Sequence, residues 1–234
     1  MAAPVTVAAL YVDPAGAYAG LEGVEVWDEA RDARLYDGPY PVVAHPPCNR
    51  WCRMAGFVEK VYGHKRGDDG GTFAAGLKSV RTHGGVLEHP AHSLAWDHFN
   101  LPQPAWREGW NLALDGSAVC YVEQGRYGLP VKKGTWLYAF GIAPSDLPEL
   151  RWGFTPDRDG DPANQDEWGG MHGWRDSWKR VSDLGLGESR LRGDDFEPGL
   201  QYADASHTPP AFRDVLLAMA RSASRQRMEG SVSC

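Results

Sequence analysis

Short apolar runs separated by turn-forming residues recur along the first 141 residues of the chain. Runs of this kind that are rich in β-branched and aromatic residues, and that stop at Gly, Pro or Asp, are typical of β-strands. The predicted strands span residues 5–12, 24–27, 42–44, 86–87, 119–123 and 135–141. Because several of these runs are apolar without alternation, as buried parallel strands are, we predict an α/β fold with a Rossmann-like, mainly parallel sheet.

Two longer segments repeat their apolar residues at helical spacing. In residues 72–83, Phe73, Leu77 and Val80 share one face of a predicted helix. A second helix is predicted to follow Thr208, because prolines suit the first turn. Its apolar face consists of Phe212, Val215, Leu216, Met219 and Ala220. We expect a short helix over 93–99, and a frayed tail from Ser222 onward.

The fading of this periodicity sets the predicted domain limits. Residues 1–141 form the α/β domain, 142–207 form an irregular lobe or substrate-recognition insert, and 208–221 return to the α/β domain. Within the first domain, residues 100–118 are rich in Pro, Trp and Gly and are predicted to be a connection.

Composition narrows the class of protein. The formal charge of −7 excludes a generally basic protein that coats nucleic acid, although a local basic cleft is compatible with it. Four cysteines show no disulfide-framework spacing, and no apolar run reaches the roughly 20 residues that span a bilayer. We therefore expect a cytoplasmic protein with reduced thiols and no membrane partner.

A cysteine lies just past the predicted strand at 42–44. Pro46 and Pro47 lack the N–H that would continue the ladder, so Cys48 follows the carboxyl end of the strand. Ligands bind at that edge of open α/β sheets, which suits a nucleophile. A buried structural cysteine after a tight turn fits the same pattern.

The predicted strand at 86–87 is followed by a second polar group, Glu88-His89. If the two strand ends meet, Glu88 could exchange protons with a substrate beside the thiol of Cys48. Alternatively, Glu88 caps the helix predicted at 93–99. Metal ligation would use a Cys/His set with spacings unlike those of zinc fingers, and we assign no metal site. That set is Cys48, Cys52, His64, His89 and His92.

Carboxylates near the N-terminus are candidates for cofactor contacts. Asp13 and Gly16 lie in a turn of small residues, and Asp28 follows the strand at 24–27, where a doubly wound sheet often holds a ribose hydroxyl. Asp32 follows four residues later. An ordinary turn and a solvated charged segment explain the same residues.

Basic residues connect the last two predicted strands. Arg126, Lys132 and Lys133 are suited to clamp a phosphate or a base, and they are equally compatible with an exposed hairpin.

In order along the chain, these motifs resemble those of the cytosine-5 DNA methyltransferases. Pro46-Pro47-Cys48 resembles their catalytic Pro-Pro-Cys loop, and Glu88-His89-Pro90 their Glu-Asn strand end. Residues 127–135 resemble their Tyr-Gly-x-Pro-Gln-x-Arg-x-Arg segment, and 136–141 the strand that closes it. Residues 208–210, with the helix that follows, are similar to their C-terminal segment beside the cofactor. The pattern also resembles proteins of actinobacterial bacteriophages, which implies a host cytoplasm.

The resemblance implies a cytosine C5-modifying transferase acting on DNA or a pyrimidine nucleotide. Cys48 would add to C6 of the ring and Glu88 would stabilise the protonated ring nitrogen. The implied donor is S-adenosylmethionine or another one-carbon donor. The implied catalytic residues are Cys48, Glu88, Lys133 and Arg126. The implied cofactor-binding residues are Asp13, Gly16, Asp28 and Asp32. The implied substrate-binding residues are Pro47, Asn49, Arg50, His89, Tyr127 and Lys132.

The chain departs from the family pattern at several positions. Lys133 stands at the first Arg of the third motif, Thr135 at the second and Val131 at its Gln. The glycine-rich first motif is replaced by Asp13-Pro14-Ala15-Gly16. Two alternatives therefore stay open: a catalytically inactive methyltransferase-like protein that binds nucleic acid or a partner, and a Cys/His metal enzyme.

Overall fold

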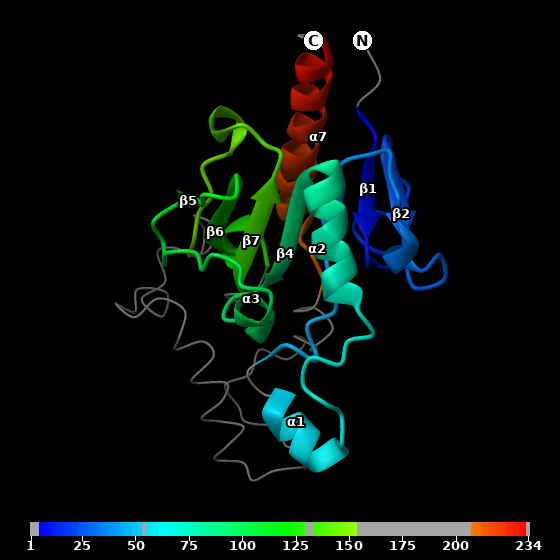
Figure 1. Ribbon diagram of the computed structural model, residues 1–234, viewed down its shortest axis with the longest axis vertical. Coiled ribbons are helices and arrows are strands. Elements are labelled where there is room, and N and C mark those ends of the chain that lie inside the picture. Colours follow the sequence, from blue (N-terminus) through cyan, green and yellow to red (C-terminus); the bar gives the residue numbers. More distant parts are fainter. Residues whose placement is uncertain (1–4, 53–54, 130–132, 154–206, 233–234) are drawn as a thin grey trace.

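A single seven-stranded sheet organises the chain (Figure 1). The computed structural model describes residues 5–52, 55–129, 133–153 and 207–232. The strand order is β2-β1-β3-β4-β7-β6-β5. The strands are β1 Val7–Leu10, β2 Val24–Trp27, β3 Val42–Ala44, β4 Gly85–Pro90, β5 Trp110–Leu112, β6 Ser117–Glu123 and β7 Gly134–Phe140.

The two halves of the sheet differ in strand direction. β2, β1, β3 and β4 are parallel, with Leu10 opposite Ala44 and Ala44 opposite Leu87. β7 is antiparallel to both β4 and β6, and β5 is antiparallel to β6. An α/β fold is thus confirmed with a mixed sheet, parallel in one half. The short connection between β6 and β7 forces them antiparallel, because a parallel pair needs a crossover of a dozen residues or more.

The predicted helices are present. α2 spans Thr72–His83, α3 spans Leu94–His98 with Ser93 as its N-cap, and α7 spans Pro210–Val232. α7 continues well beyond Ser222, so the prediction of a frayed tail from that residue is wrong. The remaining helices are α1 Ala55–Tyr62 and the short 3₁₀ helices η1 Ala33–Leu35, η2 Gln124–Tyr127 and η3 Pro144–Asp146.

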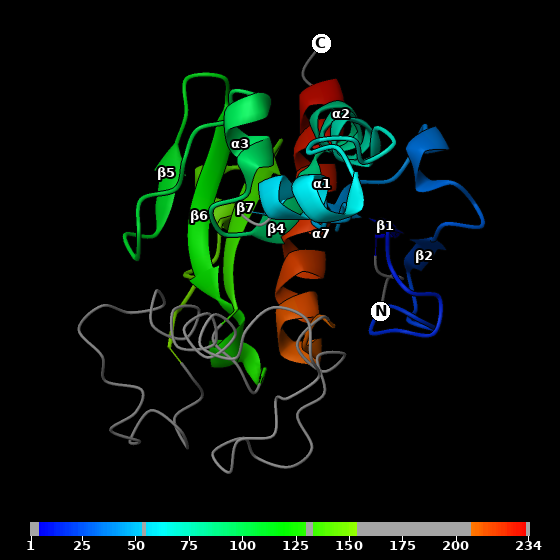
Figure 2. The ribbon, with the colours of Figure 1, turned by 90° about the horizontal axis from the view of Figure 1, so that it is seen from below.

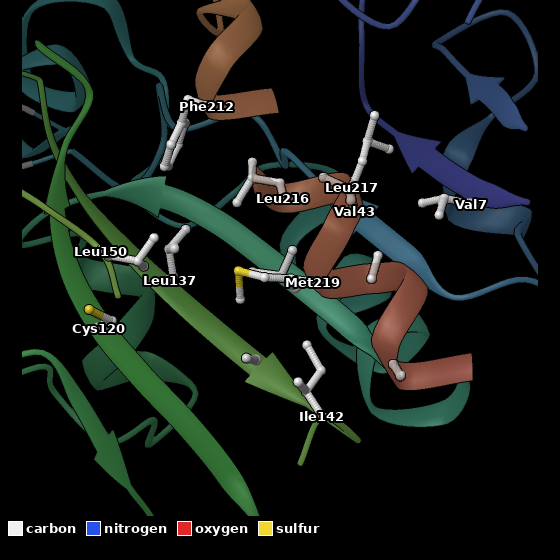
Figure 3. Packing of buried hydrophobic residues seen from close by; sticks show 14 of the residues in the cluster. Val7, Val43, Cys120, Leu137, Ile142, Leu150, Phe212, Leu216, Leu217 and Met219 are labelled. Carbon is white, nitrogen blue, oxygen red and sulfur yellow. The ribbon is translucent and has the colours of Figure 1, made fainter. Parts of the chain in front are cut away.

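Helices cover both faces of the sheet (Figures 1 and 2). α2 packs on one face, where Phe73, Leu77 and Val80 bury against the odd-numbered positions of β4 and the even-numbered ones of β1 and β3. α7 packs on the other, where Phe212, Leu216 and Met219 form a core with strand residues (Figure 3). Those strand residues include Val7, Val43, Val86 and Leu137. The predicted apolar faces of both helices are confirmed.

The C-terminal helix covers the face above β1. The segment between β1 and β2, residues 11–23, contains no helix. The guanidinium of Arg213 donates to the Ala17 carbonyl at 2.7 Å, past the carboxyl end of β1, and Arg221 donates to the Val5 carbonyl at 3.2 Å, before its start. α7 therefore runs antiparallel to β1 and begins at the carboxyl edge of the parallel strands.

Three boundaries differ from those predicted from the sequence. Glu88, His89 and Pro90 lie within β4 rather than after it, because they pair with Leu137, Trp136 and Thr135 of β7. The segment 100–118 contains β5 instead of being only a connection. Ile142 and Leu150, assigned to an irregular lobe, pack into the core beneath α7. The rest of that lobe, 154–206, lies outside the described residues.

Within the ranges that the structure describes, no helix is both long and apolar enough to cross a membrane.

Candidate active site at the carboxyl edge of the sheet

Two neighbouring parallel strands bring the site together. Ala44 is opposite Leu87 in the β3–β4 register, so His45 and Glu88 follow at the next position of each strand. Side chains alternate along a strand, and both of these point to the α7 face. Glu88 retains only 6% of its exposed area.

Glu88 is held by two hydrogen-bond partners from outside its own strand. His45 Nδ1 lies 2.9 Å from Glu88 Oε2, and Gln124 Nε2 donates to Oε1 at 2.9 Å. The same amide donates to the hydroxyl of Thr135 at 3.0 Å. Burial alone would raise the pKa of Glu88, but the charge of Lys133 and the hydrogen bond from His45 outweigh it and lower the pKa to about 2. Glu88 is therefore a carboxylate at neutral pH.

The loop that carries Cys48 is anchored at both neighbouring helices. Trp51 is 3% exposed, its indole N–H donates to Asp69 at 2.8 Å, and its carbonyl accepts the Leu94 N–H at 2.8 Å. Asp69 also accepts the N–H of Phe73 at the start of α2. One carboxylate thus ties the loop to the N-terminus of a helix, which fixes the position of Cys48 at the sheet edge.

Cys48 is half-buried and electrostatically coupled to the same site. Burial and the charge of Glu88 raise the pKa of its thiol, and the charge of Lys133 lowers it. Lys133 therefore acts on both Cys48 and Glu88. The structure brings together these three of the four residues predicted to be catalytic, with Cys48 resting as a thiol.

The remaining residues of the third motif lie beside this group. Arg126 and Tyr127 are the last two residues of η2, the 3₁₀ helix that begins at Gln124. The ring of Tyr127 packs on Phe212 at 5.1 Å between centroids and its hydroxyl accepts the Arg151 N–H at 3.2 Å, so its contacts are structural. Lys132, predicted to bind substrate, lies outside the described residues.

The predicted substrate residues near Cys48 separate into exposed and buried ones. Pro47 and Asn49 are exposed and Arg50 is half-buried, all on the surface of the loop. His89 instead points to the α2 face between Phe73 and Trp96 and has no exposed surface. Burial lowers the pKa of His89 to about 4, so its imidazole is neutral and inaccessible to a substrate.

The predicted cofactor residues are occupied by local contacts. Asp13 Oδ1 accepts the Ala15 N–H at 2.8 Å, and the Asp13 carbonyl accepts the Gly16 N–H at 2.9 Å. Asp28 likewise accepts the Arg31 N–H at 2.9 Å. Asp32 caps η1 and pairs with its neighbour Arg34, whose hydrogen bond lowers the Asp32 pKa.

These contacts do not fit the cradle that S-adenosylmethionine needs in a doubly wound sheet. Such a cradle uses free N–H groups of a glycine-rich turn and the N-terminus of the helix that follows. Here the turn N–H groups of Ala15 and Gly16 are taken by Asp13, and no helix follows before β2.

A metal site was the other cofactor alternative. In the described ranges, no three His, Cys, Asp or Glu side chains cluster so that they could hold an ion. The Cys/His set considered from the sequence is thus not assembled in this part of the chain.

Sequence reasoning missed three residues of the site: Tyr18, His45 and Gln124. The Tyr18 hydroxyl lies 2.8 Å from His45 Nε2, which extends the network to the connection after β1. His45 could have been found, because a polar residue directly after a buried strand is the signal that selected Cys48. Tyr18 has no such signal, since it lies among small residues of a turn.

No protein-family model matches the chain, and no curated protein or solved structure matches it either.

Proposed function

We propose that this chain is a cytosine C5-modifying transferase that acts on DNA or a pyrimidine nucleotide through covalent attack by Cys48. The observation that carries the proposal is that Glu88 and the Cys48 loop belong to neighbouring parallel strands, β4 and β3, while Lys133 is joined through its carbonyl to Gln124, which donates to Glu88. The charge of Lys133 acts on both Cys48 and Glu88. These are the residues that the resemblance assigns to nucleophile, ring-nitrogen contact and substrate positioning. They come from separate motifs more than 30 positions apart in the printed sequence.

The first chemical step adds the thiol across the ring. The sulfur of Cys48 bonds to C6, the C5–C6 electron pair moves toward N3, and the thiol proton is passed to N3. The adduct is neutral, and its C5 is an enamine carbon able to attack a one-carbon donor. Water takes the C5 proton, the C6–S bond breaks as the C5–C6 double bond re-forms, and the proton on N3 returns to the sulfur, which restores the ring and the thiol. Because Cys48 rests as a thiol, its proton has to move during attack.

Glu88 suits the ring-nitrogen contact as a hydrogen-bond acceptor. An ionised carboxylate accepts about four hydrogen bonds, and His45 and Gln124 provide one each. In the proposal, the lone pairs that no other described residue occupies accept from the protonated N3 and the exocyclic amine of cytosine. The low pKa of Glu88 favours stabilisation of the N3 proton over donation of a proton.

The strand order also supports the proposal. The usual doubly wound order is 3-2-1-4-5-6. If β2-β1-β3-β4 are taken as strands 2-1-4-5 of that order, without the outer third strand, Cys48 would follow the fourth strand and Glu88 would lie in the fifth. β6 runs parallel to β4, with the reversed β7 between them.

Exchange of the cytosine C5 hydrogen in D₂O tests the attack without any donor. Once the thiol has added, C5 takes up a deuteron and loses its proton, and elimination returns deuterated cytosine. We expect exchange with wild type on duplex DNA, single-stranded DNA or dCMP, and none with Cys48→Ser. Absence of exchange on all three substrates by folded wild type would overturn the proposal.

A trapping experiment identifies the donor. We expect DNA containing 5-fluorocytosine to form a stable adduct only when the correct one-carbon donor is present, because fluorine cannot leave C5 as a proton does. Intact mass with S-adenosylmethionine, then with a folate one-carbon donor, separates the donors. The local contacts of Asp13, Asp28 and Asp32 give no preference for S-adenosylmethionine.

A second candidate is a catalytically inactive methyltransferase-like protein that binds nucleic acid or a partner. The raised pKa of the Cys48 thiol and the occupied turn after β1 favour it. Binding of DNA by both wild type and Cys48→Ser, with no C5 exchange by either, is the result expected for this candidate.

A further inference from the structure

A chain of hydrogen bonds crosses the carboxyl edge beneath the start of α7. It runs from the Tyr18 hydroxyl to His45 Nε2 at 2.8 Å and from His45 Nδ1 to Glu88 Oε2 at 2.9 Å. Tyr18 comes from the β1–β2 connection, His45 follows β3, and Glu88 belongs to β4. Glu88 is thus the one strand residue of the three, and the other two lie in the segments that follow β1 and β3.

All three side chains are removed from water. Tyr18 is 2% exposed and Glu88 is 6% exposed, while the side chains of His45 and Glu88 in the pair retain 11% and 7%. The first turn of α7 lies against the Tyr18 end of this hydrogen-bond series, because Arg213 donates to the carbonyl of Ala17, the residue before Tyr18. A buried network of this kind holds its members in one geometry.

The hydrogen bonds fix which nitrogen of His45 carries the proton. Glu88 is ionised and can only accept, so the proton between the two residues sits on Nδ1. Burial raises the pKa of Tyr18, so its phenol keeps its proton, and the described residues offer it no acceptor other than Nε2. A neutral imidazole with Nδ1–H satisfies both contacts.

We propose that His45 is the positioning residue of this site: held by the Tyr18 hydroxyl, it donates from Nδ1 to Glu88 and so orients that carboxylate toward the substrate. This inference rests on the proposed function, since it assigns Glu88 its orientation for the ring-nitrogen contact. In many covalent enzymes a third group holds the catalytic base in position through a hydrogen bond. Here His45 would hold the carboxylate of Glu88 in the same way.

Other titratable groups act on two of these residues. Lys133 and His89 act on Glu88, and Glu88, Arg213 and Asp214 act on Tyr18. Lys133 lowers the pKa of Glu88 independently of His45. Loss of His45 is therefore expected to raise the pKa of Glu88 without abolishing the charge of the carboxylate at neutral pH.

The tautomer can be measured in the intact protein without any substrate. A long-range ¹H–¹⁵N correlation spectrum at mildly alkaline pH is expected to show His45 with Nδ1 protonated and Nε2 hydrogen-bonded as an acceptor. In Tyr18→Phe the Nε2 signal should move to that of a free acceptor while Nδ1 stays protonated. An Nε2–H tautomer in wild type would overturn the proposal whatever the protein catalyses.

The pH profile of C5 exchange tests the effect on the site. We expect His45→Ala to catalyse C5 exchange roughly 10-fold to 100-fold more slowly than wild type. As the pH is lowered, the rate of the variant should begin to fall at a higher pH than the rate of wild type, because the pKa of Glu88 is raised. His45→Asn, whose amide can replace the Nδ1–H donor, should recover most of the rate and the wild-type acid limb. His64→Ala, an exposed histidine with no role in the network, is the matched control.

The outcomes separate the two proposals. Equal slowing by His45→Ala and His45→Asn with an unchanged acid limb, in variants of wild-type thermal stability, would mean a merely structural histidine. No exchange by wild type, together with the Nδ1–H tautomer, would overturn the proposed function while supporting the orientation of Glu88 by His45.

Discussion

The carboxyl ends of β1 and β2 differ sharply from those of β3 and β4. Carboxylates at the first pair are exposed or half-buried and are satisfied within a few residues of sequence, as Asp13 and Asp28 are. At the second pair, Glu88 is buried and held by His45 and Gln124 from other elements. Local contacts form ordinary turns, whereas a buried charge shared among distant elements has to be built by the whole fold.

The buried carboxylate favours the β3–β4 side as the place of the proposed chemistry. Burying a carboxylate is costly unless it is paired, and proteins retain such groups most often at functional sites. Within the described residues, the carboxyl ends of β1 and β2 have no comparable buried carboxylate held by distant elements. Substitutions on the two sides are therefore expected to have very different effects.

Glu88→Gln breaks the β3–β4 side most strongly while preserving side-chain volume. We expect C5 exchange to slow by about 100-fold or more, because a neutral amide oxygen accepts from the protonated N3 without the negative charge that stabilises it. The NH₂ group of the new glutamine would also lie against a hydrogen-bond donor, either His45 or Gln124, where Glu88 has an accepting oxygen. A Glu88→Gln rate within about threefold of wild type would remove Glu88 from the mechanism.

Acid titration of stability sharpens the comparison. The pKa of Glu88 is lowered from 4.5 to about 2, so its ionisation stabilises the fold above pH 4.5 and this contribution is lost as pH falls toward 2. The difference corresponds to roughly 3 kcal/mol at most.

Denaturant unfolding as a function of pH measures this contribution. We expect the free energy of unfolding to fall more steeply between pH 4.5 and 2 in wild type than in Glu88→Gln. Parallel curves for the two proteins over that window would contradict the buried, charge-paired carboxylate.

Asp69→Ala tests how the Cys48 loop is held. The carboxylate of Asp69 accepts from the indole of Trp51 and from the Phe73 N–H in the first turn of α2, so we expect a loss of about 1–2 kcal/mol in stability. C5 exchange should slow by several-fold because Cys48 is less well positioned. Asp68→Ala, the exposed neighbour, is the control, and equal rates in the two variants would show that the anchor does not act on the site.

Asp28→Asn on the β1–β2 side should have the smallest effect. Asn can still accept the Arg31 N–H, so the expected change in stability is below about 0.5 kcal/mol. Donor-independent C5 exchange should stay within about twofold of wild type. A large loss of exchange in this variant would show that the β1–β2 side takes part in the attack itself.

Much of the fold could be predicted from the sequence because local pattern determines it. The apolar runs gave β2 and β3 directly, and the helical spacing of Phe73, Leu77 and Val80 gave α2. The antiparallel half of the sheet was not predicted as such, because strand direction depends on pairing between distant residues. β5 was missed because its three residues are too short a pattern.

The candidate site was only partly predictable for the same reason. Cys48 and Glu88 could be selected because each follows an apolar run. The partners Tyr18 and Gln124 are not visible in any local pattern, since they are brought to Glu88 and His45 only by the register of the sheet. His89 was assigned to the substrate because the predicted strand ended at Leu87. Since β4 continues to Pro90, side chains alternate along it and His89 is turned to the opposite face from Glu88.

Nucleophilic attack by Cys48 is decided by C5 hydrogen exchange in D₂O, measured for wild type and Cys48→Ser on the same DNA and on dCMP. We expect wild type to deuterate cytosine at C5 without any donor, and the serine variant, folded and as stable as wild type, to give only the uncatalysed background. Equal exchange by both proteins, or none by wild type, would contradict nucleophilic attack by Cys48.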